Sequence, residues 1–330
     1  MNKMSQKYKK VEEAIKNAEN TLVVSHRKPD ADTLGAAVSV SLHLDRLNKP
    51  HKLACVDKPS SRYSFIPKID QFVSEFCLSD FDLVIVLDAG ASYMTNFHLK
   101  YKDFFNSGAL MVNIDHHASN DNFGDINIVE PEAASVTEIL TKMFSFLGIE
   151  ISQDMATCLL AGIYSDTGSF MHSNTSKTVL KTASYLMEKG AKIKEITKYL
   201  FKNNSVEKLK MWGRVMEKSF VTDQKVVMSV VKEEDYNDVG ASPEHLSGVV
   251  DYLNMIPNTK FAVLVNEDRE GNVKGSFRTR CEEVDLSKVA AVFGGGGHPK
   301  ASGFNINGKL KEKIEYEIVY DDMSKQSLKF

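Results

Sequence analysis

The chain has 330 residues, of which 42% are hydrophobic, and its formal net charge is −3 at pH 7. It contains no run of about 18 apolar residues and no secretory signal, so we expect a soluble cytoplasmic protein rather than a membrane or secreted one. The lack of a basic excess argues against a protein that clamps long nucleic acids. The four cysteines are scattered without CxxC spacing, which argues against a disulfide framework or a structural zinc site.

Helical periodicity alternates with short apolar runs in the first half of the chain. Apolar residues three and four apart indicate helices, and short β-branched runs indicate strands buried on both faces. Such alternation is typical of βαβ units, which build a parallel sheet with helices on both faces. The predicted elements are a helix at 8–18, a strand at 21–24, a helix at 33–47, strands at 83–87 and 110–114, and a mainly helical stretch at 135–201.

The second half predicts a smaller α/β domain. Strands are predicted at 226–231, 261–265 and 273–277, and helices at 245–253 and 286–292. A polar, lysine-rich stretch around Trp212 precedes them. The whole chain is therefore predicted to be an α/β protein with a first domain at 1–203, a linker at 204–218 and a second domain at 219–330, and ligands are expected at the carboxyl ends of the first domain's strands.

Several ionisable residues follow the predicted strands of the first domain. His26, Asp30 and Asp32 come after the strand at 21–24, at the carboxyl end where parallel sheets bind ligands. Residues two apart in extended chain point the same way, so Asp30 and Asp32 can face one site. An aspartate at position 32 could instead cap the following helix, and the same alternative holds for Asp88 after the next strand.

Two further segments add candidate ligands. Asp115, His116 and His117 follow the strand at 110–114, and because consecutive side chains alternate in direction, at least one of the three must lie away from any shared ion. Asp166 stands where an apolar helix gives way to a glycine-containing turn.

Together these motifs offer two histidines and four aspartates, with no thiolate. Hard oxygen donors with some imidazole suit manganese, magnesium or cobalt better than a tetrahedral zinc site. Six protein ligands are too many for one catalytic ion with open positions, but they suit two ions that share a carboxylate. Two ions about 3.5–4 Å apart can clamp the attacking and leaving oxygens of a displacement at phosphorus. The motifs thus predict a two-metal phosphoesterase.

Four successive glycines, Gly294 to Gly297, precede His298 in the second domain. Such a run is costly inside a helix or strand, but it lets the backbone approach a ligand and form an amide nest for an anion. A flexible turn with an incidental histidine is the alternative. Arg278 and Arg280 are predicted to share one face of a strand and to bind phosphate oxygens, although one of the two could be surface charge alone.

These segments resemble the DHH phosphoesterase family, named for its Asp-His-His triplet, and the second domain resembles the domain that accompanies it in many members. The likeness rests on segments in family order: His26-x3-Asp30-x-Asp32, Asp88, Asp115-His116-His117 with Asn120, Asp166-Thr-Gly168, and Gly295-Gly-Gly297-His298. Ala36 and Ser165 depart from frequent family residues, but neither change removes a ligand.

The resemblance implies a role for each residue. Two divalent cations, with manganese preferred, would be held by His26 and Asp30 for one ion, by Asp32, His116 and Asp166 for the other, and by Asp88 for both. His117 would contact the substrate or donate a proton, and Asp115 would orient the histidines. The resemblance also implies an active site in the interdomain cleft, where the second domain would hold the substrate's phosphate or base through six residues: Arg278, Thr279, Gly295, Gly296, Gly297 and His298.

Within the family, a two-domain chain of this length resembles bacterial nano-RNases. The resemblance implies a phosphate-ester hydrolase that degrades short oligoribonucleotides to mononucleotides, converts 3′-phosphoadenosine 5′-phosphate to AMP, and forms a homodimer. A phosphodiesterase for cyclic or linear dinucleotides, such as cyclic di-AMP or pApA, is the alternative that the motifs do not separate.

Three other classes fit less well. An inorganic pyrophosphatase would be expected to lack the glycine-histidine loop, and a processive exonuclease would need additional nucleic-acid-binding domains. A nucleotide sensor without activity would be expected to have lost metal ligands, whereas all six are present here.

Overall fold

A computed structural model of the chain describes residues 3–201, 204–311, 313, 316–319 and 325–328. The chain divides into two compact units, Met1–Asn203 and Asn204–Phe330. Residues 202 and 203, at the predicted domain boundary, lie outside the described residues. Within the described ranges, no helix is long and apolar enough to cross a membrane.

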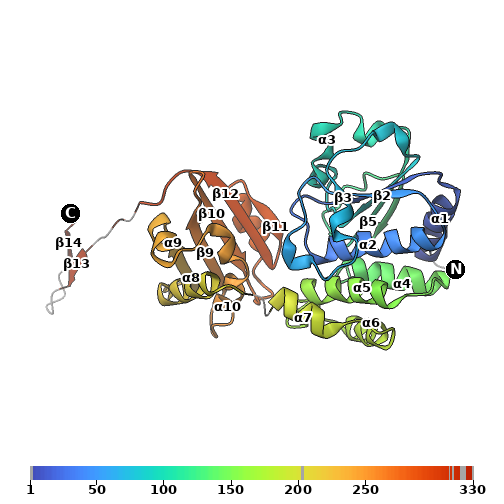
Figure 1. Ribbon diagram of the computed structural model, residues 1–330. Coiled ribbons are helices and arrows are strands. Elements are labelled where there is room, and N and C mark those ends of the chain that lie inside the picture. The colour runs from blue at the N-terminus through green and yellow to red at the C-terminus, as the bar shows by residue number, and fades with distance from the viewer. Residues whose placement is uncertain (1–2, 202–203, 312, 314–315, 320–324, 329–330) are drawn as a thin grey trace. The chain divides into compact units, whose positions relative to one another are not determined.

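The first unit is built on a six-stranded, wholly parallel sheet with the order β3-β2-β1-β4-β5-β6 (Figure 1). Strands β2 and β3 lie on one side of β1, and β4, β5 and β6 lie on the other. The direction in which the chain adds strands to the sheet therefore reverses between β1 and β4. Ligand sites of open parallel sheets lie at such a reversal. The strands are β1 (Thr21–Ser25), β2 (His51–Ala54), β3 (Phe72–Val73), β4 (Leu83–Leu87), β5 (Leu110–Asp115) and β6 (Ile126–Val129).

Helices cover both faces of this sheet, as predicted, but unequally. One face packs against long helices, and alternate strand residues such as Val23, Ile85 and Val112 point into that core. The other face packs against aromatic side chains, including Phe97 and Phe104, from short helical segments. The helices of this unit are α1 (Lys3–Asn17), α2 (Ala31–Arg46), α3 (Phe97–Lys100), α4 (Val136–Leu147), α5 (Gln153–Asp166), α6 (Lys177–Glu188) and α7 (Ile193–Phe201), with 3₁₀ turns η1 (Ser61–Tyr63), η2 (Ile69–Gln71), η3 (Leu78–Asp80), η4 (Ser92–Thr95) and η5 (Phe104–Asn106).

The second unit contains a mixed six-stranded sheet with the order β11-β12-β10-β9-β8-β7, in which only β8 and β9 are parallel neighbours among the described strands. Its strands are β7 (Phe220–Val221), β8 (Val226–Val231), β9 (Phe261–Glu267), β10 (Asn272–Arg278), β11 (Gly296–His298) and β12 (Ala301–Asn307). Its helices are α8 (Val206–Glu217), α9 (Glu233–Val239), α10 (Val249–Leu253) and α11 (Leu286–Ala291), with the 3₁₀ turn η6 (Pro243–Leu246). A hairpin of β13 (Tyr316–Val319) and β14 (Lys325–Leu328) follows.

Three predictions for this unit need correction. The expected linker at 204–218 contains helix α8, whose Met211 and Val215, four residues apart, are buried in the core of the unit. The expected helix at 245–253 is interrupted at Gly248, where φ is 90°. The glycine run was expected to form a loop, but Gly296 to His298 pair with β12 as an edge strand.

Candidate active site

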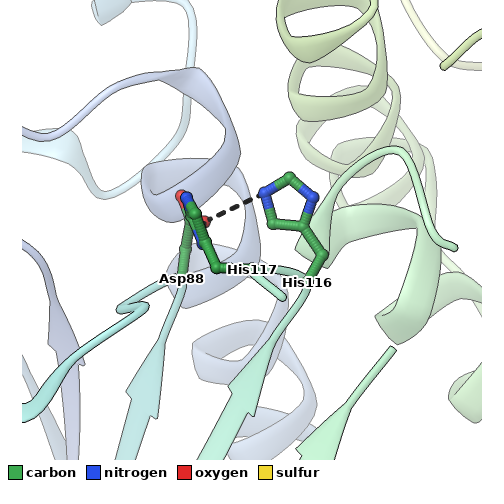
Figure 2. A group of neighbouring side chains, drawn as sticks. All are labelled: Asp88, His116 and His117. Carbon is green, nitrogen blue, oxygen red and sulfur yellow. Dashed lines mark ion pairs between the residues drawn. The ribbon is translucent and has the colours of Figure 1, made fainter. Parts of the chain in front are cut away.

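Asp88 stands at the centre of a cluster at the carboxyl ends of β1, β4 and β5. Its Oδ2 lies 3.3 Å from His26 Nε2. Its Oδ1 lies 3.6 Å from His116 Nε2 and 3.8 Å from His117 Nδ1, and Figure 2 shows Asp88 with these two histidines. Asp88 is buried, and its Oδ1 accepts no hydrogen bond from the described residues. Leaving a buried carboxylate oxygen without a donor is costly, so this oxygen is suited to a cation.

The structure brings all six predicted metal ligands together. Three groups have ligand atoms within 4.8 Å of one another: His26, Asp30 and Asp88; Asp32, His116 and Asp166; and Asp88, His116 and His117. Asp88 and His116 each belong to two of these groups. The oxygen-rich donor set and the unpartnered oxygen of Asp88 are therefore suited to divalent cations. Because Asp88 and His116 each belong to two groups, the donor set is suited to more than one cation.

The carboxylates are crowded enough to shift their protonation. Burial and the negative charge of Asp88 raise the pKa of Asp32 to about 7. Burial, followed by the charges of Asp32 and Asp30, raises the pKa of Asp166 well above its usual range. Both shifts favour the protonated carboxyl, and a bound cation would oppose them by neutralising the repulsion between the carboxylates.

His26 and Asp88 stabilise each other's charge. Although burial lowers it, the pKa of His26 rises to about 10 because the imidazole pairs with Asp88. The pKa of Asp88 falls below its usual range for the same reason, despite the opposing effect of burial. A cation on these side chains would take over the role of the imidazolium proton.

Asp30 and Asp32 are held by different helices. Asp30 Oδ1 accepts hydrogen bonds from the backbone nitrogens of Asp32 at 2.9 Å and Thr33 at 3.1 Å, so the N-cap that the sequence allowed for Asp32 belongs to Asp30. Asp32 is fully buried, and its carboxylate reaches the first turn of α4. Its Oδ2 accepts from Val136 N at 2.6 Å, and its Oδ1 accepts from Thr137 N at 3.0 Å and Thr137 Oγ1 at 2.5 Å.

Gly162 of α5 makes this arrangement possible. A methyl group at this position would lie 2.4 Å from both Asp32 Oδ1 and Thr137 Oγ1, and one at Gly35 would lie 2.4 Å from the Cys158 carbonyl oxygen. Helices α2, α4 and α5 can therefore approach closely only with glycine at these positions. Thr137 and Gly162 were not predicted from the sequence, because the Ser135-x-x-Glu138 pattern indicates where a helix starts but not what the start of that helix contacts.

Asp115 orients His117 rather than joining the cluster. The two side chains meet at 2.7 Å between Asp115 Oδ1 and His117 Nδ1, and Asp115 Oδ2 accepts from Asn120 Nδ2 at 2.6 Å. Burial lowers the pKa of His117, but the hydrogen bond to Asp115 and the charges of Asp88 and Asp115 together raise it by more, so the net shift is upward. A methyl group at Gly90 would lie 3.0 Å from His117 Cβ, so the small residue there gives the histidine its space.

In the second unit, the strand register places Arg278 and His298 on one face of the sheet. Ala301 of β12 pairs with Arg278 on one side and with His298 on the other, and directly paired residues point the same way. Arg278 Nε donates to Asp251 Oδ1 at 2.8 Å, with about a third of each side chain exposed. Arg280 was predicted to lie on the same strand, but β10 ends at Arg278.

Thr279 uses its side chain within the fold. The hydroxyl donates to the Lys260 carbonyl oxygen at 2.6 Å and accepts from Cys281 N at 3.0 Å, and the residue is buried. The structure therefore gives Thr279 a role in joining neighbouring segments, and its contact with substrate stays a prediction.

The glycines of the run differ in what they permit. A methyl group at Gly295 would lie 2.2 Å from the Gly303 carbonyl oxygen, and one at Gly297 would lie 2.7 Å from the Ala301 carbonyl oxygen. Close contact with β12 thus explains these two glycines without a ligand. Gly296 is exposed and has open space at its Cα, so ligand approach remains available there.

Two family models match the chain in succession. The model described as the DHH family, N-terminal domain, matches residues 20–163, and the model of the DHHA1 domain matches residues 223–318. The first match contains every residue of the cluster around Asp88 except Asp166, and the second contains Arg278 and His298.

Curated proteins resemble the chain along both units. A protein named bifunctional oligoribonuclease and PAP phosphatase NrnA, from Thermus thermophilus, is 28% identical over 92% of this chain and 89% of its own length. A Bacillus subtilis protein of the same name is 26% identical over 85% of this chain and 87% of its own. The crystal structure of an exopolyphosphatase-related protein from Bacteroides fragilis shares the fold, with a TM-score of 0.87, 23% identity and 94% coverage of both chains.

Proposed function

This chain belongs to the DHH phosphoesterase family, with a DHH domain followed by a DHHA1 domain, and we propose that it hydrolyses short oligoribonucleotides to mononucleotides and 3′-phosphoadenosine 5′-phosphate to AMP. Membership makes it a hydrolase of phosphate esters, and the choice of substrates is the proposal. The observation that carries the choice is the match to NrnA proteins through both domains, over 89% and 87% of their lengths.

The cluster around Asp88 would hold two divalent cations in this proposal. His26 and Asp30 would bind one, Asp32, His116 and Asp166 the other, and Asp88 both, as their grouping supports. Manganese suits this mixture of carboxylate and imidazole. When bound, such a pair supplies positive charge that stabilises the phosphoryl oxygens during in-line displacement.

His117 would serve the substrate from the edge of the cluster. Its Nδ1–H donates to Asp115, which fixes the ring's orientation and leaves Nε2 as the nitrogen that meets the substrate. A proton on Nε2 can pass to the leaving oxygen of the substrate. Because Asp115 contacts Nδ1 of the same ring, it stabilises the protonated imidazole, and His117 is suited to hold that proton.

Arg278 and His298 would hold a phosphate of the same substrate. Asp251 and the Phe277 carbonyl oxygen engage Nε and Nη1 of the guanidinium, and no described residue bonds Nη2, which would donate to the phosphate. The shared face of Arg278 and His298 supports a joint role.

Parallel assays would test the proposal. The full chain is incubated with manganese and, separately, a diribonucleotide, a five-nucleotide RNA, 3′-phosphoadenosine 5′-phosphate, cyclic di-AMP and pApA, and kcat/KM is compared. We expect the short RNAs and 3′-phosphoadenosine 5′-phosphate to be turned over most efficiently. A strong preference for cyclic di-AMP or pApA would refute the substrate assignment and leave the phosphoesterase assignment intact.

A further inference from the structure

An interior strand of the first unit carries a buried polar residue with no part in the proposed mechanism. Asn113 lies in β5 between Val112 and Ile114 and is fully buried. Burial of an amide in such surroundings is costly unless hydrogen bonds compensate for it. The partners of Asn113 therefore indicate what the residue contributes.

A continuous chain of hydrogen bonds joins Asn113 to His117. Asn113 Nδ2 donates to Asn120 Oδ1 at 2.9 Å and to Asn127 Oδ1 at 3.1 Å. Asn120 Nδ2 donates to Asp115 Oδ2 at 2.6 Å, and Asp115 Oδ1 accepts from His117 Nδ1 at 2.7 Å. Because Asn113 and Asp115 are two residues apart in a strand, they point to the same face, and the amide of Asn120 spans the gap between them.

The loop after His117 is also packed onto Asn113. A methyl group at Gly124 would lie 3.0 Å from Asn113 N and 3.1 Å from Asn113 Cβ. Asn127 binds the same loop, accepting from Gly124 N at 3.0 Å and donating to the Gly124 carbonyl oxygen at 2.5 Å. The two N–H groups of Asn113 thus anchor the loop at Asn120 and, through Asn127, near its end.

We infer that Asn113 is a positioning residue for His117 and acts through Asn120 and Asp115. The inference rests on the proposed function, in which His117 meets the substrate. A residue that only stabilised the strand would affect turnover whether or not His117 is present. A residue that positions His117 affects turnover only when His117 is present.

A double-mutant cycle tests this directly. Asn113→Leu removes both N–H donors at similar volume and is measured alone and together with His117→Ala. The substrate is a diribonucleotide at saturating manganese, because its sugar oxygen needs a proton to leave, whereas p-nitrophenolate would leave without one. Manganese affinity is measured separately by calorimetry. We expect Asn113→Leu to lower kcat roughly tenfold, part of the about 10²- to 10⁴-fold that a positioned general acid contributes. KM and manganese affinity should be unchanged, and no further fall should occur in the His117→Ala background.

An equal fall in both backgrounds, or no fall in either, would overturn the inference. If His117→Ala itself leaves kcat unchanged, the proposed role of His117 fails, and the inference fails with it. A chain that turns over cyclic di-AMP or pApA but not the diribonucleotide would refute the proposed substrates, and the same cycle is then measured on that dinucleotide, whose leaving group is also a sugar oxygen. Should Asn113→Leu not fold, Asn120→Ala breaks the same chain from the loop and is measured in the same cycle.

Thr21→Val is the matched control. Thr21 is a fully buried polar residue of β1 whose Oγ1 has no hydrogen-bond partner in the described part of the chain. Its substitution removes a buried polar group from the same sheet without touching the chain from Asn113 to His117, so kcat should be retained.

Discussion

The two units hold their candidate functional side chains in different ways. In the first, Asp32 and Asp115 are fully buried; Asp32 accepts hydrogen bonds from the distant helix α4, and Asp115 accepts from the loop that follows it. In the second, Arg278 is partly exposed and His298 is exposed on an edge strand. The first arrangement suits chemistry that needs fixed atoms, and the second suits binding that tolerates small displacements.

Asp88→Ala should show the largest effect, because Asp88 lies within reach of His26, His116 and His117. We expect kcat to fall by at least about 10³-fold, since even outer partners of metal ligands cost about 10- to 100-fold when lost. The measurement is kcat at saturating manganese, with calorimetry to count bound ions. Substantial remaining activity would show that the fixed site of the first unit does not depend on a shared carboxylate.

Asp88→Asn is the control for the backbone. Asp88 has a φ of 59°, in the left-handed region that asparagine and aspartate tolerate best. The asparagine variant keeps this conformation and removes the charge, so a loss of activity equal to that of the alanine variant would attribute the effect to the lost carboxylate.

Thr137→Val should weaken metal binding without unfolding the protein. The variant removes the 2.5 Å hydrogen bond from Thr137 Oγ1 to Asp32 but leaves the two backbone donors in place. We expect manganese affinity to fall about tenfold, the lower range for lost outer partners. Thr137→Ser, which keeps the hydroxyl, should restore it; an affinity that is equally low in the serine variant would contradict the role of the hydroxyl.

Arg278→Ala should weaken the binding of substrate by the second unit. We expect KM for a diribonucleotide to rise about tenfold, equivalent to about 1.4 kcal/mol, with little change in kcat. Arg280→Ala is the control, because Arg280 is exposed and lies beyond the end of β10. A fall in kcat at unchanged KM would mean that the second unit takes part in the fixed geometry of the reaction.

Asp268→Asn should have the smallest effect and should leave the candidate site untouched. Asp268 lies between β9 and β10, where its carboxylate accepts from Glu270 N and Asn272 N at 2.8 and 2.9 Å and pairs with Lys274 Nζ at 3.0 Å. Burial would raise the pKa of this carboxyl, but these donors lower it well below its usual range. We expect Tm at pH 7 to fall by about 2–4 °C.

The pH dependence of this effect follows from the direction of the shift. A depressed pKa stabilises the folded state above the ordinary aspartate value, and that contribution is lost as the pH falls through the lower folded value. The difference in Tm between Asp268→Asn and the unsubstituted chain should therefore shrink in acid. A difference that persists at low pH would assign the effect to packing instead of charge.

Patterns local in sequence predicted much of the fold. Strands β4 and β8 begin and end at the predicted residues, since β4 is an uninterrupted apolar run and β8 is apolar apart from Ser229. The parallel order then places His26, Asp88 and His116 at one edge of the sheet. A linker was predicted in place of helix α8 because of its charged residues, although Met211 and Val215 have helical spacing. The short strand β11 was not predicted because it lies in a run of glycines.

Contacts between distant segments could not be predicted in this way. Asp32 and Thr137 are 105 residues apart, and nothing near either residue indicates that they meet. The amides that join Asn113 to His117 are closer in sequence, but an asparagine in a strand does not reveal its partners. The contacts of such supporting residues depend on how helices and loops pack together, and a pattern within one segment does not predict that packing.

The open space at Gly296 makes one position in the glycine run suitable for a spectroscopic reporter. A side chain there would meet no atom within 4 Å, whereas Gly295 and Gly297 are closed by β12. A Gly296→Cys variant, combined with Cys77→Ser to remove the exposed native thiol, could carry a thiol-reactive fluorophore two residues from His298. Its emission would then report the arrival of a nucleotide at the second unit separately from the bond cleavage assigned to the first.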